Sequence, residues 1–366
     1  MTLPSRQPEP TVSAESDSTR LSRRTFRLRT CVWEITLACN CYCVHCGSSA
    51  GACRRNELTT TEALALIAEL AELGCESVTL SGGEPLLRED WPELAHAIRK
   101  AGMRLEMITN GLCVAEQARV IHDCGFYGVT FSVDGPADIH DSLRGVRGAL
   151  QRLLEGAEAL RQMGTRIGAV TQINRCNIDE LAAIHELLVA HGFEGWQWQL
   201  TMPQGRAKQR SEQLCLLPTE LPRLEQTLLD FRKRRGPFIY AADNIGYMSR
   251  NEPLLRSLPG EEMGFWTGCR AGINVIGVTS DGSIRGCLSQ PPAANEGNIR
   301  ERGLSSIWRD PMAFAYNRCF RTDNLQGVCA GCAFGKICRG GCRGLAWAAS
   351  PEQPCSNPYC TYSVTR

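Results

Sequence analysis

Short apolar runs alternate with longer amphipathic stretches between residues 30 and 200, and this alternation restricts the fold more than any other feature of the chain. The apolar runs are bounded by polar or glycine-rich residues, as buried strands are. Expected strands cover residues 32–37, 77–80, 104–108, 128–133, 166–173 and 195–200, and expected helices cover residues 60–73, 92–101, 115–124, 148–163 and 178–191. About six strand–helix units predict an α/β fold with a parallel sheet and outer helices.

Polar and glycine motifs come directly after several of these strands. Ser81-Gly82-Gly83-Glu84-Pro85 follows the second strand, Thr109-Asn110-Gly111 the third and Asp134-Gly135 the fourth. In parallel barrels the chemistry is carried at the carboxyl ends of the strands. We therefore expect the functional site at this edge of the sheet.

The regular alternation weakens after about Met202. A polar linker is predicted at 203–218 and a helix at 220–235, and the chain is rich in cysteine and glycine from Cys269 onward. We expect four parts: a polar, disordered tail at 1–29, a core at 30–202, a linker or bridging region at 203–268 and a small cysteine-rich domain at 269–366.

The charge balance gives no electrostatic reason to expect nucleic acid as a partner, because 40 basic residues face 39 acidic ones. No apolar run approaches the length that a membrane crossing requires. Residues 22–26 resemble the start of a twin-arginine export signal, but the residues after them include Arg27, Arg29 and Glu34 and contain no apolar region or cleavage site. We predict a cytoplasmic protein without a membrane partner.

The twenty cysteines are unusual for a chain of 366 residues. In a reducing compartment, cysteines at ligand spacing indicate a metal site rather than disulfides. Cys39, Cys43 and Cys46 form a C-x3-C-x2-C motif directly after the first strand. Three thiolates on one loop can bind three irons of a [4Fe–4S] cube and leave the fourth iron open. The alternative is a structural zinc loop with His45 or Cys41 as its fourth ligand.

At this point the sequence resembles the radical SAM (S-adenosylmethionine) superfamily, whose signature has this cysteine spacing, often with an aromatic residue in the place of His45. The motif Gly82-Gly83-Glu84-Pro85 matches the GGEP motif of that family, and the other strand-end motifs follow in the same order. The resemblance implies a partial (β/α)6 barrel that binds SAM at the open iron. One electron from the cluster would cleave SAM, and the resulting 5′-deoxyadenosyl radical would abstract a hydrogen atom from the substrate.

The resemblance also suggests where SAM would bind. Glu84 and the main chain at Gly82 and Gly83 suit its ammonium group, and Arg144 could pair with its carboxylate. The remaining expected contacts are Ser132 and Asp134 for the ribose hydroxyls and Asn174 for the same face. Ordinary turn chemistry is the alternative for the glycine and Asp134 motifs, and surface charge is the alternative for Arg144.

A second group of cysteines resembles the SPASM extension of radical SAM enzymes, which carries auxiliary iron–sulfur clusters. The seven positions of its motif are occupied by Cys269, Cys287, Cys329, Cys332, Cys338, Cys342 and Cys360. The alternative is a zinc ribbon built from Cys329, Cys332, Cys338 and Cys342.

If the interleaved family arrangement holds, Cys329, Cys332, Cys338 and Cys360 bind one auxiliary [4Fe–4S] cluster. Cys269, Cys287 and Cys342 bind the other, which then lacks a fourth cysteine. Cys319 or a carboxylate could complete this second cluster, or one iron could stay open to substrate. Cys355 is an alternative to Cys360 as the last ligand.

The SPASM resemblance favours modification of a ribosomally synthesised peptide, by crosslinking, epimerisation or side-chain oxidation. Relatives that oxidise sulfatases tend to carry Asp directly after the cysteine that matches Cys287, whereas Leu288 follows here. The residues before Thr30 leave no room for a leader-binding domain, so a separate recognition protein or the barrel itself would bind a peptide. Reduced flavodoxin or ferredoxin is the expected electron donor.

Two alternatives stay open: a maturase of a small-molecule or tetrapyrrole cofactor with the same chemistry, and a non-enzymatic zinc-binding scaffold. Plausible substrate contacts outside the motifs are Trp196, Gln197, Trp198, Gln199, Asp243, Asn244 and Tyr247. Packing is the stronger interpretation for the Trp and Gln residues, because alternating side chains of this kind are typical of a half-buried strand.

Overall fold

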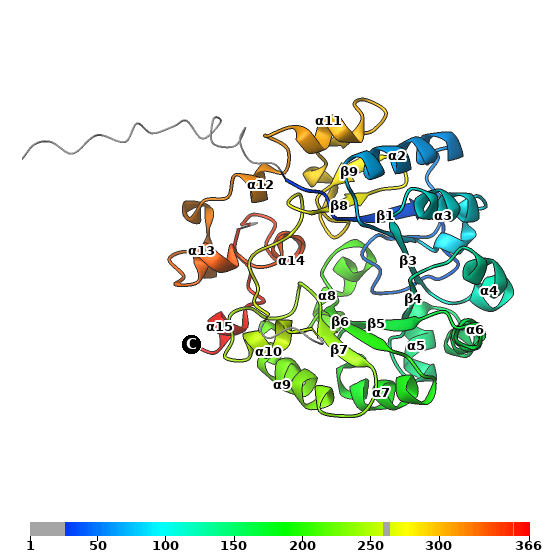
Figure 1. The fold of residues 1–366 in the computed structure, drawn as a ribbon. Coiled ribbons are helices and arrows are strands. Elements are labelled where there is room, and N and C mark those ends of the chain that lie inside the picture. Colours follow the sequence, from blue (N-terminus) through cyan, green and yellow to red (C-terminus); the bar gives the residue numbers. More distant parts are fainter. Residues whose placement is uncertain (1–25, 259–263, 354) are drawn as a thin grey trace, which may run out of the picture.

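The computed structural model describes residues 26–258, 264–353 and 355–366, and a single ten-stranded sheet organises them (Figure 1). The strand order is β10-β9-β8-β1-β2-β3-β4-β5-β6-β7. The expected N-terminal tail and the twin-arginine-like motif fall almost wholly outside the described residues.

Seven strands run parallel to one another from β1 to β7. Their bounds are β1 Thr30–Thr36, β2 Ser77–Gly82, β3 Arg104–Thr109, β4 Gly128–Ser132, β5 Ile167–Ile173, β6 Gly195–Leu200 and β7 Phe238–Ala241. In the described part of the chain no pairing joins β7 to β10, so the curved sheet does not close into a barrel.

The helices of the first six units cover the outer side of the sheet (Figure 1). They are α2 Thr60–Glu72, α3 Trp91–Lys100, α4 Val114–Asp123, α6 Ala149–Gln162 and α7 Leu181–Ala190, with the short α5 Ala137–Arg144 before α6. A capping box between Thr59 and Glu62 fixes the start of α2, because it satisfies main-chain donors that the first helical turn leaves without partners.

The alternation continues beyond residue 202. Helix α9 (Leu221–Arg232) and strand β7 add another unit, and β7 pairs with β6 from Gly195–Phe238 to Trp198–Ala241. The segment 203–218, which the sequence predicts to be a linker, contains a 3-10 helix at Gly205–Arg210 and α8 at Ser211–Leu214. This region is therefore part of the folded core rather than a spacer.

The cysteine-rich region is joined to the same sheet. Strand β8 (Val275–Val278) pairs in parallel with β1, and β9 (Ser283–Arg285) and β10 (Gly297–Asn298) continue the edge in antiparallel fashion. The short helix α10 (Glu252–Arg256) precedes this region. The region itself contains the short helices α11 Leu304–Arg309, α12 Ala315–Arg318, α13 Gly335–Cys338, α14 Arg343–Ala349 and α15 Thr361–Val364.

The interior between sheet and outer helices is a continuous apolar core. Trp33, Phe131, Trp196 and Trp198 are among its largest fully buried side chains. Trp196 and Trp198 contact each other and Phe231 of α9, so they are packing residues and not substrate contacts. No helix in the described ranges combines the length and the apolar character needed to cross a membrane.

Candidate active site

The loop that carries Cys39, Cys43 and Cys46 leaves the carboxyl end of β1 and is held on both sides. The main-chain N–H of Cys39 donates to the oxygen of Gly51 at 2.8 Å, which fixes the base of the loop. The N–H groups of Tyr42 and Val44 donate to the last oxygens of α5, those of Arg144 and Leu143, both at 3.0 Å. The end of α5 therefore positions the middle of the cysteine loop.

The thiol of Cys41 lies between those of Cys39 and Cys43. Its hydrogen bonds lower the pKa of Cys39 and of Cys43, and the nearby Arg144 guanidinium, with Nη1 3.7 Å from the Cys43 sulfur, adds to the effect at Cys43. The same hydrogen bonds raise the pKa of Cys41. Since the thiolate is the form that binds metal, this arrangement prepares Cys39 and Cys43 as ligands and leaves Cys41 protonated.

A buried charge cluster lies beside this loop at the end of β4. The Asp134 carboxylate is 2.6 Å from Nη2 of Arg144 and 3.1 Å from Nε2 of His45. Burial alone would raise the pKa of Asp134, but Arg144 and His45 hold it well below its usual range. Arg144 also donates to the main-chain oxygen of Ser132 at 3.1 Å.

This geometry changes the interpretation of two predicted SAM contacts. Asp134 also accepts from the N–H of Gln172 at 2.9 Å, so its carboxylate is occupied by protein partners rather than presented to a ribose. Arg144 is nearly buried and paired with Asp134, so it is neither an exposed surface charge nor a free partner for a carboxylate. Their shared role in this structure is to join β4, α5 and the cysteine loop.

Glu84 is fully buried at the end of β2 and accepts three hydrogen bonds. The donors are the Thr109 hydroxyl at 2.8 Å, the Asn110 N–H at 2.8 Å and the Leu86 N–H at 3.3 Å. Burial raises the pKa of Glu84 to about 7 in spite of these bonds. A carboxylate has about four acceptor positions, so one remains for a further donor. A cation beside it would favour the charged form.

Gly82 and Gly83 are required by a close approach of two main-chain segments. A Cβ at Gly82, whose φ is +148°, would lie 2.3 Å from the oxygen of Thr36, and one at Gly83 would lie 2.1 Å from that of Ala38. The N–H groups of Gly83 and Glu84 donate to these same oxygens at 2.8 and 2.7 Å. The glycines thus seat the Glu84 turn on the chain that enters the cysteine loop.

Asn174 is buried in the turn after β5 and serves that turn. Its Nδ2 donates to the oxygen of Gln172 at 2.8 Å and its Oδ1 accepts from the N–H of Cys176 at 2.9 Å. The side chain is therefore engaged locally.

An arginine clamp from the 203–218 segment, which local sequence patterns do not predict, holds the cysteine loop. Nε of Arg206 donates to the oxygen of Cys43 at 2.8 Å, Nη1 donates to that of Ala50 at 2.6 Å, and the guanidinium lies 4.2 Å from the centre of the Tyr42 ring. A Cβ at the neighbouring Gly205 would lie 2.4 Å from the oxygen of Cys46. The only sequence signal was Gly205 next to an arginine, which ordinary turns also contain.

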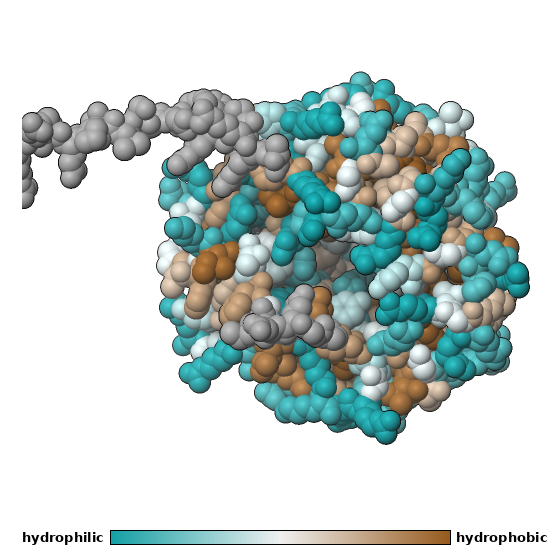
Figure 2. All heavy atoms as spheres, viewed as in Figure 1, coloured by the Kyte–Doolittle hydropathy of each residue, from teal (hydrophilic) through white to brown (hydrophobic). Residues whose placement is uncertain are grey.

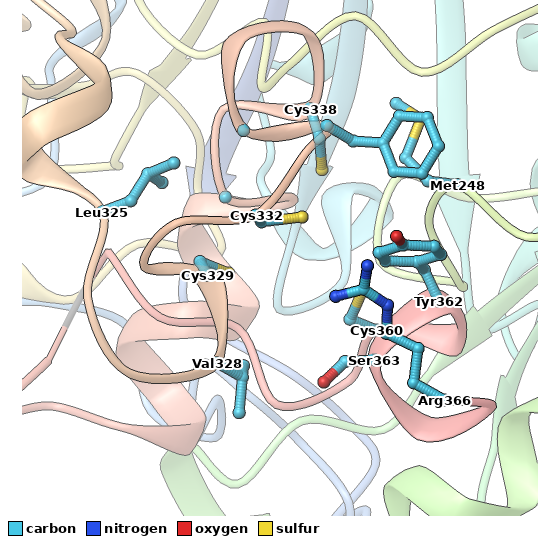
Figure 3. Close-up of a pocket in the computed structure, with 13 residues that line it drawn as sticks. Met248, Leu325, Val328, Cys329, Cys332, Cys338, Cys360, Tyr362, Ser363 and Arg366 are labelled. Atoms are coloured by element: carbon cyan, nitrogen blue, oxygen red, sulfur yellow. The ribbon is translucent and has the colours of Figure 1, made fainter.

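Cys329, Cys332, Cys338 and Cys360 line one cavity of about 50 Å³ (Figure 3). The Cys329 sulfur accepts from the N–H of Asn357 at 3.5 Å, which ties the Asn-Pro-Tyr-Cys segment to the first of these cysteines. The Tyr359 hydroxyl donates to the oxygen of Leu216 at 2.9 Å and so places Cys360. Cys355 does not line the cavity.

Cys269, Cys287 and Cys342 form a separate group. Burial raises the pKa of Cys287 to about 11 and also raises that of Cys342, and each thiol is further affected by the charge of Cys269. Cys342 does not line the cavity that Cys329, Cys332 and Cys338 share, whereas a zinc ribbon would require it there. Within the described ranges, no three His, Cys, Asp or Glu side chains lie close enough to hold a single metal ion.

A cavity of about 540 Å³ lies between the core and the cysteine-rich region. Its wall includes Gly47, directly after Cys46, and Leu288, directly after Cys287, so it reaches from the first cysteine group to another. The molecular face in Figure 2 is hollowed near its centre, where Figure 1 places α14 and α8. The volume falls within the range of about 300–1,000 Å³ that is typical of small-molecule sites.

The residues present fit the cofactors that the sequence suggests. One loop supplies three thiols, two of them with lowered pKa, beside a buried carboxylate with acceptor capacity left. A second set supplies four thiols around one cavity. This is the donor chemistry of iron–sulfur clusters.

Comparison with known proteins agrees with this donor chemistry. Residues 33–188 match the family model of the radical SAM superfamily, and residues 269–333 match that of SPASM, an iron–sulfur cluster-binding domain. The AdoMet-dependent heme synthase of Methanosarcina barkeri is 32% identical over 344 residues, which cover 91% of this chain and 96% of that protein. The PqqA peptide cyclase of Rhizobium meliloti is 25% identical over 362 residues, which cover 97% of this chain and 93% of the cyclase.

The crystal structure of Streptococcus suis SuiB bound to S-adenosylmethionine superimposes with a TM-score of 0.72 at 17% identity, covering 93% of this chain and 78% of SuiB. The predicted α/β fold, with an incomplete barrel and a cysteine-rich extension, is confirmed by this likeness and by the family match.

Proposed function

The chain belongs to the radical SAM superfamily and carries a SPASM region, and on this premise we propose that its substrate is a tetrapyrrole with carboxylate side chains. It is an enzyme whose cofactors are [4Fe–4S] clusters and SAM. When bound, these cofactors supply a 5′-deoxyadenosyl radical, which takes a hydrogen atom from the substrate. Membership of this superfamily excludes the alternative of a non-enzymatic zinc-binding scaffold.

The observation that carries the proposal is the extent of the likeness to the heme synthase. At 32% identity, the matched residues cover 96% of that relative. The likeness therefore includes the core, the segment between the domains and the cysteine-rich region. A ribosomal peptide, the substrate class expected from the sequence, has weaker support, because the peptide cyclase is 25% identical.

The cavity of about 540 Å³ supports the proposal of an anionic tetrapyrrole substrate. Its charged lining consists of Arg54, Lys208, Arg285 and one acid, Glu34. Arg54 is paired with Glu34 at 2.6 Å, whereas Lys208 makes no ion pair with any described residue. Carboxylate groups pair well with such cations, so the propionate side chains of a tetrapyrrole would be held here.

Within this proposal each part of the chain has a task. Cys39, Cys43 and Cys46 would hold the catalytic cluster, and Glu84 would accept from the ammonium of SAM. The Asp134–Arg144 pair and the Arg206 clamp would fix the cysteine loop. Cys329, Cys332, Cys338 and Cys360 would hold one auxiliary cluster, and Cys269, Cys287 and Cys342 would contribute to the other.

The test is incubation of the anaerobically reconstituted enzyme with SAM, dithionite and iron coproporphyrin III, a tetrapyrrole with four propionate side chains. We expect 5′-deoxyadenosine to form together with a product of changed mass, and deuterium to move from labelled propionates into 5′-deoxyadenosine. Lys208→Glu should weaken binding of the porphyrin, while Lys233→Glu, a surface change at the end of α9, should not. SAM cleavage with no change in the porphyrin would contradict the proposal.

A peptide substrate is the second candidate, favoured by the full-length likeness to a peptide cyclase. It predicts that deuterium comes from a labelled peptide and that the porphyrin neither binds nor changes. A separate leader-recognition protein belongs to this candidate alone. Reduced flavodoxin or ferredoxin is the proposed electron donor under both.

A further inference from the structure

The cysteine group Cys269, Cys287 and Cys342 has no fourth cysteine in its motif, and we propose that the carboxylate of Asp243 is the fourth ligand of its iron–sulfur cluster. Asp243 follows β7, in the bridging region rather than in the cysteine-rich region. The inference does not depend on the identity of the substrate.

The main chain around Asp243 is fixed by its neighbours. The N–H of Ala242 donates to the oxygen of Trp198 at 2.8 Å. Asn244 forms two hydrogen bonds with Leu200, since its Oδ1 accepts from the N–H at 3.1 Å and its Nδ2 donates to the oxygen at 2.9 Å. Asp243 is thus held at the end of β6, and Asn244, a suggested substrate contact, has a structural role.

One buried hydroxyl connects Asp243 to the cysteine group. The Tyr247 hydroxyl donates to the main-chain oxygen of Asp243 at 2.7 Å and accepts from the N–H of Cys342 at 3.0 Å. Tyr247 is fully buried, and Cys269 and Cys342 pack against the small cluster that it forms with Trp266 and Cys338. The main chains of Asp243 and Cys342 therefore meet at the same hydroxyl group.

The Asp243 carboxylate lies within electrostatic reach of two thiols of the group, those of Cys287 and Cys342. Its charge contributes to the raised pKa values of Cys287 and Cys342, after the larger effects of burial and of neighbouring sulfurs. The side chain is accessible to water, yet burial by the surrounding protein raises the pKa of its carboxyl. It makes no hydrogen bond or ion pair with any described residue, so its oxygens are available to a ligand.

A tyrosine near the cysteine group already has a partner. Burial and the charges of Cys269 and Cys287 raise the pKa of Tyr316, and its hydroxyl donates to Oε1 of Gln290 at 3.0 Å. The same Oε1 accepts from the N–H of Cys287 at 3.1 Å. The phenol is thus a support for the Cys287 turn. Cys319 is the fourth ligand suggested from the sequence, so the experiment includes a variant of it.

Three thiolates leave one iron of a [4Fe–4S] cube without a protein ligand, and an oxygen ligand would fill that position. A carboxylate completes the coordination without a fourth cysteine, and it changes the reduction potential of the cluster, because ligand identity and charge set that potential.

The experiment compares the anaerobically reconstituted full-length wild type with Asp243→Ala, Asp243→Asn, Asp243→Cys and Cys319→Ala. Iron and sulfide content, electron paramagnetic resonance and the midpoint potentials of the clusters are measured, with circular dichroism as a check of folding. The wild type should hold about twelve irons per chain, as three cubes require.

We expect Asp243→Ala and Asp243→Asn to lose about one iron per chain on mild oxidation and to give the resonance of a three-iron cluster. Asp243→Cys should keep all its iron but show a shifted midpoint potential, and Cys319→Ala should match the wild type. The proposal is overturned if Asp243→Asn keeps its iron and its potentials, if Asp243→Cys fails to restore the iron, or if Cys319→Ala is the variant that loses it.

Discussion

The Arg144 guanidinium lies 2.6 Å from the Asp134 carboxylate, and at least nine-tenths of each side chain is hidden from solvent. Asp134 follows β4, whereas Arg144 ends α5, whose last main-chain oxygens hold the cysteine loop. The ion pair therefore connects the sheet to the loop that carries Cys39, Cys43 and Cys46. Removing one partner leaves the other charge buried without compensation, which is more costly than removing both.

Arg144→Met should accordingly lower the free energy of unfolding by about 3–5 kcal/mol, and the double variant with Asp134→Asn should recover part of that loss. Thermal unfolding of the reconstituted proteins under anaerobic conditions ranks the stabilities of the wild type, the single variant and the double variant. Arg152→Met on the exposed face of α6 serves as a control with no expected effect. A double variant that is less stable than Arg144→Met would contradict this account of the pair.

The raised pKa of Glu84, about 7, predicts a pH dependence of SAM binding. Below that pH the carboxyl is neutral and no longer attracts the ammonium group, so affinity should fall by up to about tenfold for each pH unit. Near pH 6.5 the Glu84 carboxyl of the free enzyme is partly protonated. Because bound SAM favours the carboxylate, binding at this pH should release protons.

Calorimetric titration in buffers of different ionisation enthalpy measures both the affinity and the proton release. Glu84→Gln should bind SAM more weakly and show no change of affinity between about pH 6 and pH 8. Thr109→Val removes one hydrogen bond to the charged form, so it should move the midpoint of the pH profile upward. A wild-type affinity that is flat across this range would exclude Glu84 as the ammonium partner.

Gly83→Ala should disrupt the cysteine loop while the sheet remains folded. The added Cβ would lie 2.1 Å from the oxygen of Ala38, so the main chain must move at the point where it enters the loop. Gly51→Ala is a matched control beside the same loop, because a Cβ there meets nothing within 4 Å. We expect about four irons fewer per chain in Gly83→Ala and none fewer in Gly51→Ala, as measured by iron analysis after reconstitution.

Local sequence patterns were sufficient for the strand-end motifs and for the cysteine groups. Glu84 and Gly83 could be located because a turn directly after a strand depends on neighbouring residues. The partners of Arg144 could not be located in this way, since its pairing with Asp134 depends on the short helix α5, which local sequence patterns do not predict. Asp243 was suggested only as a substrate contact, because its proximity to Cys342 arises from a hydrogen bond through Tyr247 across the bridging region.

The clamp by Arg206 leads to the last prediction. Its guanidinium donates to the main-chain oxygens of Cys43 and Ala50 and lies over the ring of Tyr42, which is 67% exposed. Lysine keeps the charge but lacks the planar fork that reaches both oxygens, so Arg206→Lys should loosen the loop nearly as much as Arg206→Met. Arg210→Met, on an exposed position of the same segment, is the control.

We expect both Arg206 variants to lose iron from the catalytic cluster faster than the wild type when a chelator is added. The auxiliary clusters should be unaffected, which their electron paramagnetic resonance can establish in the same sample. If Arg206→Lys retained iron as well as the wild type, the positive charge alone would account for the contact. Equal loss from all clusters would instead indicate general unfolding, and the segment 203–218 would then have no specific role in holding Cys43 and Cys46.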